Sequence, residues 1–513
     1  MDEFDVIIIG SGLGGLVTAN ILAMEGQKVC VLEKNKQIGG ALQVYVRNRV
    51  IFDTGVHYLG GLEKGQNLYQ IFKYLGIIDK LKLKRMNDVF DTIIISDDPK
   101  EYKMAQGYEN FIKTLAAEFP AEEKAIRAYC DMLKEICSKF ALYNLRSGGV
   151  YEDKAELMEI DTKTYFASIT NDKKLQAVLA GNNMLYAGVP DKTPLYVHAL
   201  VLNSYIESSW KCVDGGSQIA KLLSRNIYQY GGVIKIHSEV ARLVEEGGRI
   251  MHVELKSGSV MQARNFISNM HPARTLELLS SPVIRSSFRN RIRQLENSIS
   301  SFTVDVIFKD NCFPELKSNY YYQKEGGVWD AATYKQDEWP LTYALFMPSY
   351  SKAFSVPAPG GEQGVRYARS MSILTYMHYS EVVKWADTFN TVSSEENRGA
   401  DYDAFKKERA EKLIDLVSEK FPSLRGCIDR YYTATPLSYR DYMGTADGSM
   451  YGIVKDHQDP LKTMISPRTK IPNLYFTGQN LNMHGILGAA ISAVLTSTLV
   501  LGSDDLIDRI REA

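Results

Sequence analysis

Three glycines and a later glutamate have the spacing of a dinucleotide-binding loop. Gly10, Gly12 and Gly15 follow the apolar run Val6–Ile9, and Glu33 closes the next apolar run. Gly10 permits a tight turn, Gly12 lets the backbone approach a pyrophosphate, and Gly15 lets a helix pack closely on a strand. A helix N-terminus favours phosphate charge, while the acid holds ribose hydroxyls and disfavours a 2′-phosphate. The pattern predicts a dinucleotide other than NADP; a glycine-rich turn without a ligand is the alternative.

A second glycine pair extends this motif. The segment KNKQIGGALQ places Gly39 and Gly40 shortly after the second apolar run. A glycine turn there lets the chain pass close under a long cofactor, and LEKxxxxGG is typical of flavoprotein oxidoreductases rather than of simple NAD dehydrogenases. A plain loop with two glycines is the alternative. Gly14 and Lys34 complete the cofactor contacts expected from these two motifs.

Near the C-terminus, the segment 485–502 carries no charge over eighteen residues. This length reaches that of a transmembrane span, but glycines, serines and threonines make it only moderately apolar, and no Trp or Lys/Arg cluster flanks it. IPNLYFTGQ, just before it, indicates a buried strand that ends in a Thr-Gly turn. A helix N-terminus after such a turn would stabilise a reduced, anionic flavin. We therefore expect a cofactor wall rather than a membrane anchor, with contacts from Gly478, Gln479, Gly485 and Ile486.

The remaining elements must surround this cofactor. Helices are expected from Tyr108 to about Phe140 and from Pro194 onward, and a third is ended by Gly231 and its following glycine. Short strands with glycine turns come next. They could rejoin the first sheet and place Val240 beside an adenine.

The 513 residues allow two or more domains, and the chain is expected to weave between them. A nucleotide-binding domain is assigned to residues 1–75, 211–275 and 466–513, and a substrate domain to 76–210 and 276–465. The composition, 45% hydrophobic and 24% charged, permits a large core. Net charge is −1, which gives no basic excess for nucleic acid. The locally basic Lys80–Arg85 stretch is interpreted as a solvated strand edge, with weak contact to anionic lipid as the alternative.

Six cysteines lie far apart, without a CxxC pair or a Cys/His cluster of zinc spacing, so no metal site is expected. This usage fits a reducing compartment. Acids at Asp2, Glu3 and Asp5 argue against a signal peptide. We therefore expect a cytoplasmic protein without a transmembrane segment.

The assembled chain resembles the phytoene desaturase and carotenoid isomerase superfamily, and within it the retinol saturase branch. The motifs that carry this resemblance over nearly the whole chain are GSGLGGL, FDTGVHYLGG, YAGVPDKTPLYVHAL, DGGSQIA, ISNMHP and IPNLYFTGQNLNMHGILGAA. FDTGVHYLGG and the YAGVP…HAL segment are much closer to the retinol saturase branch than the first and last motifs, which many flavoproteins share.

The resemblance implies an α/β fold, in which an FAD/NAD(P)-binding Rossmann-like domain of the glutathione-reductase type is interleaved with a mixed α+β substrate domain. It implies FAD, a long apolar polyene or isoprenoid substrate, and redox change at a carbon–carbon double bond. Many relatives have Asp where this chain has Gln479, so the ribityl contact would be an amide. No cysteine follows Cys427, which excludes a thioether to flavin in that segment.

Saturating a double bond requires a proton donor as well as a hydride. His57 and Tyr58, within FDTGVHYLGG, are the first candidates, and His484 could face the flavin. A purely structural role is the alternative for each histidine. Tyr186 and His198 are expected in the core or the pocket, and His271 in a turn.

Three functions remain open from the sequence: a polyene reductase, a desaturase or redox-neutral isomerase on the same scaffold, and a flavin-free lipid-binding chaperone resembling Rab GDP-dissociation inhibitors. An intact flavin motif favours an enzyme. No second nucleotide motif is present, so NAD(P)H would bind only transiently. The electron donor stays unknown. Because an apolar substrate must come from a membrane or carrier, peripheral membrane contact is expected.

Overall fold

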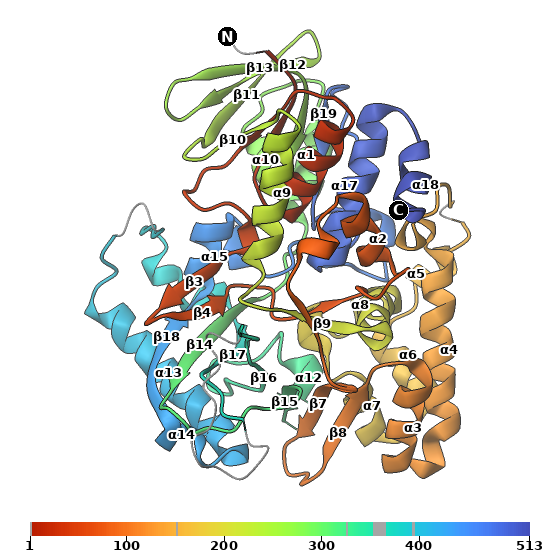
Figure 1. Ribbon diagram of the computed structural model, residues 1–513, viewed down its shortest axis with the longest axis vertical. Coiled ribbons are helices and arrows are strands. Elements are labelled where there is room, and N and C mark those ends of the chain that lie inside the picture. The colour runs from red at the N-terminus through yellow and green to blue at the C-terminus, as the bar shows by residue number, and fades with distance from the viewer. Residues whose placement is uncertain (1–2, 150–151, 325–326, 352–365, 392–395) are drawn as a thin grey trace.

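The computed structural model describes residues 3–149, 152–324, 327–351, 366–391 and 396–513. Most of the predicted Pro/Gly-rich loop at 354–368 lies outside these ranges. Two seven-stranded sheets organise the molecule, one at the top of Figure 1 and one at the bottom.

The first sheet contains the predicted nucleotide-binding unit. Its strand order is β10-β2-β1-β13-β12-β11, and β19 pairs with β13. The parallel strands are β1 (Glu3–Ile9), β2 (Val29–Leu32), β10 (Val233–Lys235), β13 (Val260–Ser268) and β19 (Leu474–Phe476). Antiparallel strands β11 (Val240–Glu246) and β12 (Arg249–Leu255) extend it. The chain thus returns twice to the sheet that it began, and the strand pattern after residue 232 predicts the first of these returns.

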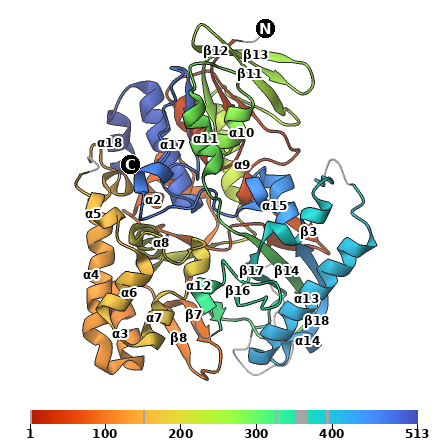
Figure 2. The ribbon, with the colours of Figure 1, turned by 180° about the vertical axis from the view of Figure 1, so that it is seen from behind.

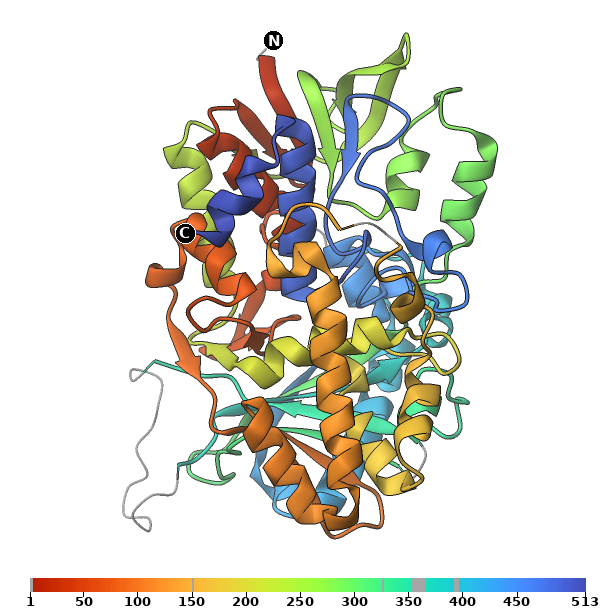
Figure 3. The same cartoon turned by 90° about the vertical axis from the view of Figure 1, so that its right-hand side faces the viewer.

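Helices α1 (Leu13–Met24), α9 (Ser217–Gln229) and α17 (Gly485–Leu501) pack together beside this sheet. Figure 3 shows the red α1 beside the blue C-terminal helices, of which α18 spans Asp505–Arg511. Most residues of α17 are buried, and the Thr496 hydroxyl donates to the Phe476 carbonyl of β19 at 2.9 Å. The uncharged segment is therefore part of the core. No helix within the described ranges is both long and apolar enough to cross a membrane.

The second sheet is mixed and has the order β18-β14-β17-β16-β15-β7-β8. Its strands are β7 (Val89–Ile95), β8 (Glu101–Ala105), β14 (Ser300–Phe308), β15 (Asn319–Gln323), β16 (Thr342–Phe346), β17 (Ser370–Met377) and β18 (Ile428–Ala434). Neighbours run antiparallel except β7 and β15, which are parallel. That parallel pair places Asp91 directly opposite Asn319.

Helices flank this sheet on two sides. The long α13 (Ala400–Lys420) and the short α14 (Leu424–Cys427) lie along its β18 side (Figure 1, Figure 2). The other side holds α3 (Tyr108–Glu118), α4 (Glu123–Lys139), α5 (Ala155–Met158), α6 (Thr162–Ile169), α7 (Lys173–Leu179) and α8 (Leu195–Glu207). The expected single helix from Tyr108 to Phe140 is wrong: it is two helices, broken at Pro120, which has no backbone N–H to continue the first one.

Smaller elements join the two sheets. They are the hairpin β3 (Val44–Arg47) and β4 (Val50–Asp53), the small sheet of β5 (Leu59–Gly60), β6 (Leu83–Arg85) and β9 (Ser209–Cys212), and the helices α2 (Asn67–Tyr74), α10 (Pro272–Glu277), α11 (Ser286–Gln294), α12 (Gly327–Asp330), α15 (Pro436–Met443) and α16 (Pro460–Thr463). The strands confirm the α/β class, with a Rossmann-like unit and a mixed second domain. The exact domain boundaries stay a prediction.

The cysteines require a correction. Cys312 and Cys427 form a disulfide, although their separation of 115 residues gave no sequence signal. The other four, Cys30, Cys130, Cys137 and Cys212, are buried and form no disulfide. A disulfide does not agree with the expectation of a reducing compartment.

Candidate active site

One cavity of about 1030 Å³ joins the two sheets. At one end it is lined by the carboxyl ends of β1, β2 and β13, where ligands of open parallel sheets bind. At the other end it is lined by Tyr321, Phe346 and Leu374 of the second sheet. Its size is at the upper limit of ordinary ligand sites, about 300–1,000 Å³. The cavity therefore has room for a long cofactor and a second molecule.

The glycine loop at the first end has no room for side chains. A Cβ on Gly14 would lie 2.6 Å from Oδ1 of Asn269 and 2.7 Å from Cα of Gly478, and one on Gly12 would lie 2.8 Å from Nδ2 of Asn269. Gly12 is also the N-cap of α1 and makes no side-chain cap, so the first N–H groups of this helix stay available to a ligand. This loop of Gly10, Gly12 and Gly14, called the glycine cradle below, fits a pyrophosphate.

A buried carboxylate lies beside the cradle. Oε2 of Glu33 accepts hydrogen bonds from the backbone N–H and the hydroxyl of Ser11, at 3.1 and 2.5 Å, and Oε1 accepts from the N–H of Asn35 at 2.8 Å. These bonds fix the carboxylate at the edge of the cavity, which Glu33 lines. The geometry suits an acceptor for ribose hydroxyls.

A second helix N-terminus lies at the cavity wall. Gly485 and Ile486 begin α17 and line the cavity, and the N-cap residue His484 makes no side-chain cap. The positive end of this dipole favours negative charge on a ligand. Together, cradle, carboxylate and second helix fit a flavin dinucleotide, which supplies hydride transfer when it is bound.

Most predicted cofactor residues meet at this cavity. Those that line it are Gly10, Gly12, Gly14, Glu33, Lys34, Gly39, Gly40, Val240, Gln479, Gly485 and Ile486. Gly15 and Gly478 do not line it. They are required for packing, since a Cβ on Gly15 would lie 2.1 Å from the Gly10 carbonyl and one on Gly478 would lie 2.3 Å from Oδ1 of Asn269.

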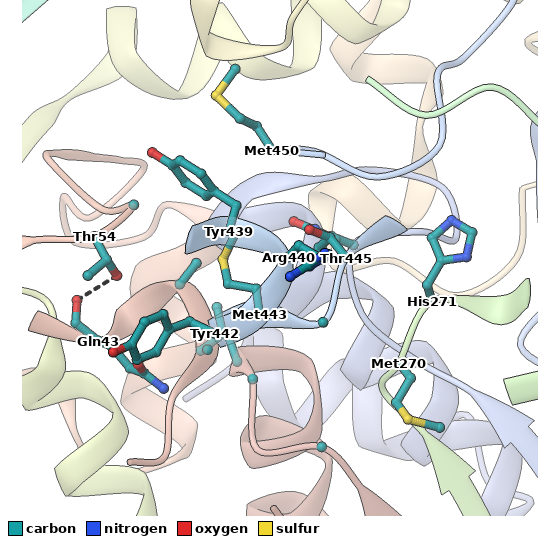
Figure 4. Close-up of a pocket in the computed structure, with 18 of the residues that line it drawn as sticks. Gln43, Thr54, Met270, His271, Tyr439, Arg440, Tyr442, Met443, Thr445 and Met450 are labelled. Atoms are coloured by element: carbon teal, nitrogen blue, oxygen red, sulfur yellow. Dashed lines mark hydrogen bonds between the residues drawn. The ribbon is translucent and has the colours of Figure 1, made fainter. Parts of the chain in front are cut away.

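Sequence reasoning missed the part of the cavity wall that α15 forms. Figure 4 shows Tyr439, Tyr442 and Met443, from α15, between Gln43 of the N-terminal region and His271 after β13. His271 is the N-cap of α10, where its Nδ1 accepts from the Ala273 N–H, so the expected turn position is confirmed, although it also lines the cavity. The sequence motif ISNMHP, which contains Asn269, pointed to one part of this wall. No motif marked the residues of α15.

Aromatic side chains line the far end. The His57 ring stacks on Phe346, with centroids 4.3 Å apart and planes within 3°. Burial, aided by the Lys211 charge, lowers the pKa of His57 to about 4, so this imidazole is neutral near pH 7. Tyr58, Tyr205 and Tyr321 also line this end. Such walls favour a flat, apolar guest with a polar contact at the tyrosine hydroxyls.

Tyr58 belongs to a buried polar network. Its hydroxyl lies 2.8 Å from Oδ2 of Asp91 and 2.8 Å from the hydroxyl of Tyr321. The amide of Asn182 donates to the same Oδ2 at 2.7 Å, and that of Asn319 donates to Oδ1 at 2.9 Å. Burial raises the pKa of Asp91 to about 7, against the opposite effect of Asn319, Tyr58, Asn182 and the Lys211 charge. The carboxyl at the centre of the network can therefore both bind and release a proton near neutral pH.

The third catalytic candidate, His484, does not line the cavity. Its Nε2 is buried without a hydrogen-bond partner within the described residues, and its ring lies 4.7 Å from that of Tyr451. Burial and the nearby Lys455 charge lower the pKa of His484 to about 4. Elsewhere, His198 is a core residue, held by Tyr129 at 2.7 Å and Tyr186 at 2.9 Å.

Comparison with known proteins supplies the family. Residues 13–501 match the family described as flavin containing amine oxidoreductase. The chain belongs to this family. It is 26% identical to an all-trans-retinol 13,14-reductase of Rattus norvegicus over 98% of this chain and 86% of that protein, and 24% identical to a chloroplastic prolycopene isomerase of Daucus carota over 96% and 79%. The solved cyclohexylamine oxidase of Brevibacterium oxydans matches 100% of this chain and 99% of its own, at 14% identity and TM-score 0.60.

These findings confirm the predicted resemblance and the enzyme class. The match to the amine oxidoreductase family begins just after the first glycines of the cavity and covers all of the second sheet and most of the first. The protein is a flavin-dependent oxidoreductase. The likeness to the cyclohexylamine oxidase shows a shared fold.

Proposed function

We propose that this flavoprotein uses FAD to reduce a carbon–carbon double bond of a long apolar polyene or isoprenoid. The observation that carries the proposal is the continuity of one cavity from the glycine cradle to the aromatic end at Tyr58 and Phe346. A cofactor held at the cradle and reaching toward the aromatic end would meet an apolar guest there. Similarity to retinol 13,14-reductases over 98% of the chain supports this choice of substrate class.

The FAD would be bound without a covalent link. No cysteine is among the residues described as lining the cavity, and Cys427 is already paired with Cys312. Gly10, Gly12 and Gly14 would hold the pyrophosphate, Glu33 the ribose, and Val240 the adenine. Gly485 and Ile486, at the start of α17, would stabilise the reduced ring. NAD(P)H would bind only transiently, and the electron donor stays open.

A redox-neutral isomerase or a desaturase is the second candidate, favoured by the similarity to a prolycopene isomerase. Product mass separates the three reactions. Photoreduced enzyme is mixed anaerobically with all-trans-retinol as the test polyene, and products are analysed by mass spectrometry. A gain of two hydrogens supports the reductase. Unchanged mass with altered geometry indicates an isomerase, and a loss of two hydrogens from a dihydro substrate by the oxidised enzyme indicates a desaturase.

We also propose peripheral contact with a membrane. Phe389 lines the cavity and is 40% exposed, and Val383 on the same segment is 56% exposed. Exposed apolar side chains of this kind would let the protein rest on a lipid surface. Phe389→Glu with Val383→Glu should abolish co-flotation with phosphatidylcholine vesicles. Leu461→Glu, 58% exposed on α16 and absent from the lining, is the matched control; equal flotation of all variants, or none by the native protein, contradicts the contact.

A further inference from the structure

We propose that Asp91, Tyr58 and Tyr321 form a proton relay into the cavity, with Asp91 as the proton reservoir and Tyr321 as the donor to substrate. The inference rests on the proposed reduction of a double bond. Asp91 is completely buried and does not line the cavity, whereas both tyrosines do. Among the hydrogen-bond partners of the carboxyl, only Tyr58 lines the cavity, so a proton on the carboxyl reaches a guest by way of the tyrosine hydroxyls.

The hydrogen-bond order makes the relay directional. Each tyrosine hydroxyl carries one hydrogen, and the three oxygen atoms form a chain with two steps of 2.8 Å. When Asp91 is ionised, Tyr58 donates to the carboxylate and Tyr321 donates to Tyr58, so neither hydrogen points to the cavity. When Asp91 is protonated, it donates to Tyr58, Tyr58 donates to Tyr321, and the Tyr321 hydrogen is free for a guest.

The surroundings are built to hold the carboxyl in place. The amides of Asn182 and Asn319 donate to its two oxygens, and each amide leaves its own carbonyl oxygen buried without a partner in the described structure. Buried polar groups left unsatisfied cost free energy, about 1–3 kcal/mol each. Both amides therefore hold the Asp91 carboxyl in place at a cost in the stability of the fold. This cost indicates that the position of the carboxyl serves a function.

The charges that face Asp91 set its proton affinity. Lys211 and the donors Tyr58, Asn182 and Asn319 favour the ionised form, and burial favours the neutral form. Tyr205 and Tyr321 are the other titratable groups that face it, and both remain protonated because burial raises their pKa. Burial outweighs the attractive contacts, so the pKa of Asp91 rises to about 7. The reservoir can then both release and recover a proton near neutral pH.

The step balances as follows. The π bond of the substrate breaks, hydride from the reduced flavin forms a C–H bond at one carbon, and the Tyr321 proton forms a C–H bond at its neighbour. Tyr321 regains a proton from Tyr58, and Tyr58 regains one from Asp91. Before the next turnover, a proton from water that enters the emptied cavity passes back through Tyr321 and Tyr58 to the Asp91 carboxylate. Two electrons come from the reduced flavin and none from the relay.

Three variants test the relay: Asp91→Asn, Tyr58→Phe and Tyr321→Phe. The control is Tyr322→Phe, on the same strand, whose ring stacks on Tyr343 at 4.6 Å and does not line the cavity. Each is purified with FAD, photoreduced and mixed with all-trans-retinol. We expect single-turnover reoxidation at saturating retinol to fall about 100-fold or more in the relay variants, a typical loss for a general acid, with unchanged FAD content. The control keeps the native rate.

The pH profile separates a relay from a structural role. In the native protein and the control, the rate falls as pH rises through about 7, because Asp91 loses its proton. In Asp91→Asn this inflection is absent. A native-like rate and an unchanged inflection in Asp91→Asn overturn the relay.

An infrared measurement keeps this test independent of the proposed function. Difference spectra between about pH 5 and about pH 9 of the flavin-loaded protein without substrate should contain a protonated-carboxyl band that Asp91→Asn lacks. If native protein does not act on retinol, the proposed function fails while this band still reports the reservoir. Identical spectra for both proteins overturn the reservoir whatever the substrate.

Discussion

The Tyr58 hydroxyl and the Asp91 carboxylate, 2.8 Å apart, connect the predicted FDTGVHYLGG motif to a strand that carried no motif. Tyr58 lies just before β5, and Asp91 lies on β7 of the second sheet. The contact places a titratable acid one hydroxyl away from the cavity. The histidine beside this tyrosine, His57, is neutral and stacked, so the phenol is the better proton donor of the two.

Removing one amide from Asp91 should raise its pKa further. The Asn319 side chain favours the ionised carboxyl, so Asn319→Leu is expected to move the inflection of the single-turnover pH profile to higher pH. Gln323→Leu is the matched control, because Gln323 lies on the same strand and donates to the Ala177 carbonyl instead. An inflection that stays in place or moves to lower pH would show that the amide does not act on this carboxyl.

Glu33→Gln should weaken FAD binding while the fold is retained. The variant keeps an oxygen for Ser11 or Asn35 but loses the charge that we assign to the ribose. Hydrogen bonds to charged groups contribute about 1.5–3 kcal/mol, so affinity should fall about 10- to 100-fold. Titration of apo-protein with FAD by fluorescence quenching measures it. Glu246→Gln, at the exposed end of β11, should leave affinity unchanged, and an equal loss in both would refute the assignment.

Much of the cofactor end was predictable because its constraints are local. Glycine is required at fixed spacing where the chain turns tightly, approaches a ligand closely or packs a helix on a strand. The segment from Gly10 to Gly40 has this spacing. The uncharged C-terminal segment was recognisable as a core helix from its small and hydroxylated residues.

The aromatic end was not predictable because its partners are distant in sequence. Tyr58 and Tyr321 are 263 residues apart, and only the parallel pairing of β7 with β15 brings Asn319 opposite Asp91. A single buried aspartate in a strand gives no pattern. The disulfide between Cys312 and Cys427 was not predictable either, because these cysteines are also far apart in the sequence.

The stability of the hairpin region should depend on pH through Asp53. Its carboxylate accepts the Gly216 N–H at 2.8 Å, but burial and the nearby Asp305 charge raise its pKa to about 7. The folded protein then binds the proton more tightly than the unfolded chain, so this contribution is complete at low pH and is lost as pH rises through about 7. Urea unfolding should show a smaller loss of stability between about pH 5 and about pH 7 in Asp53→Asn than in the native protein. Equal losses would contradict the shift.

The disulfide is tested by counting thiols. Protein denatured without reductant should react with a thiol reagent at four sites of its six cysteines, because Cys312 and Cys427 are paired. Closing a loop of this length stabilises a fold by roughly 2–5 kcal/mol, so Cys312→Ser should lower the free energy of unfolding by that order. Six reactive thiols would contradict the pairing and restore the expectation of a reducing compartment.

The central claim is that this flavoprotein passes electrons from FAD to a polyene, and an anaerobic visible spectrum tests it most directly. The purified protein is reduced photochemically and then mixed with all-trans-retinol. The account predicts flavin bands in the purified protein that bleach on reduction and return after the polyene is added. Bands that stay bleached with the polyene would contradict the proposed direction, and a colourless protein that does not take up FAD would contradict the cofactor site itself.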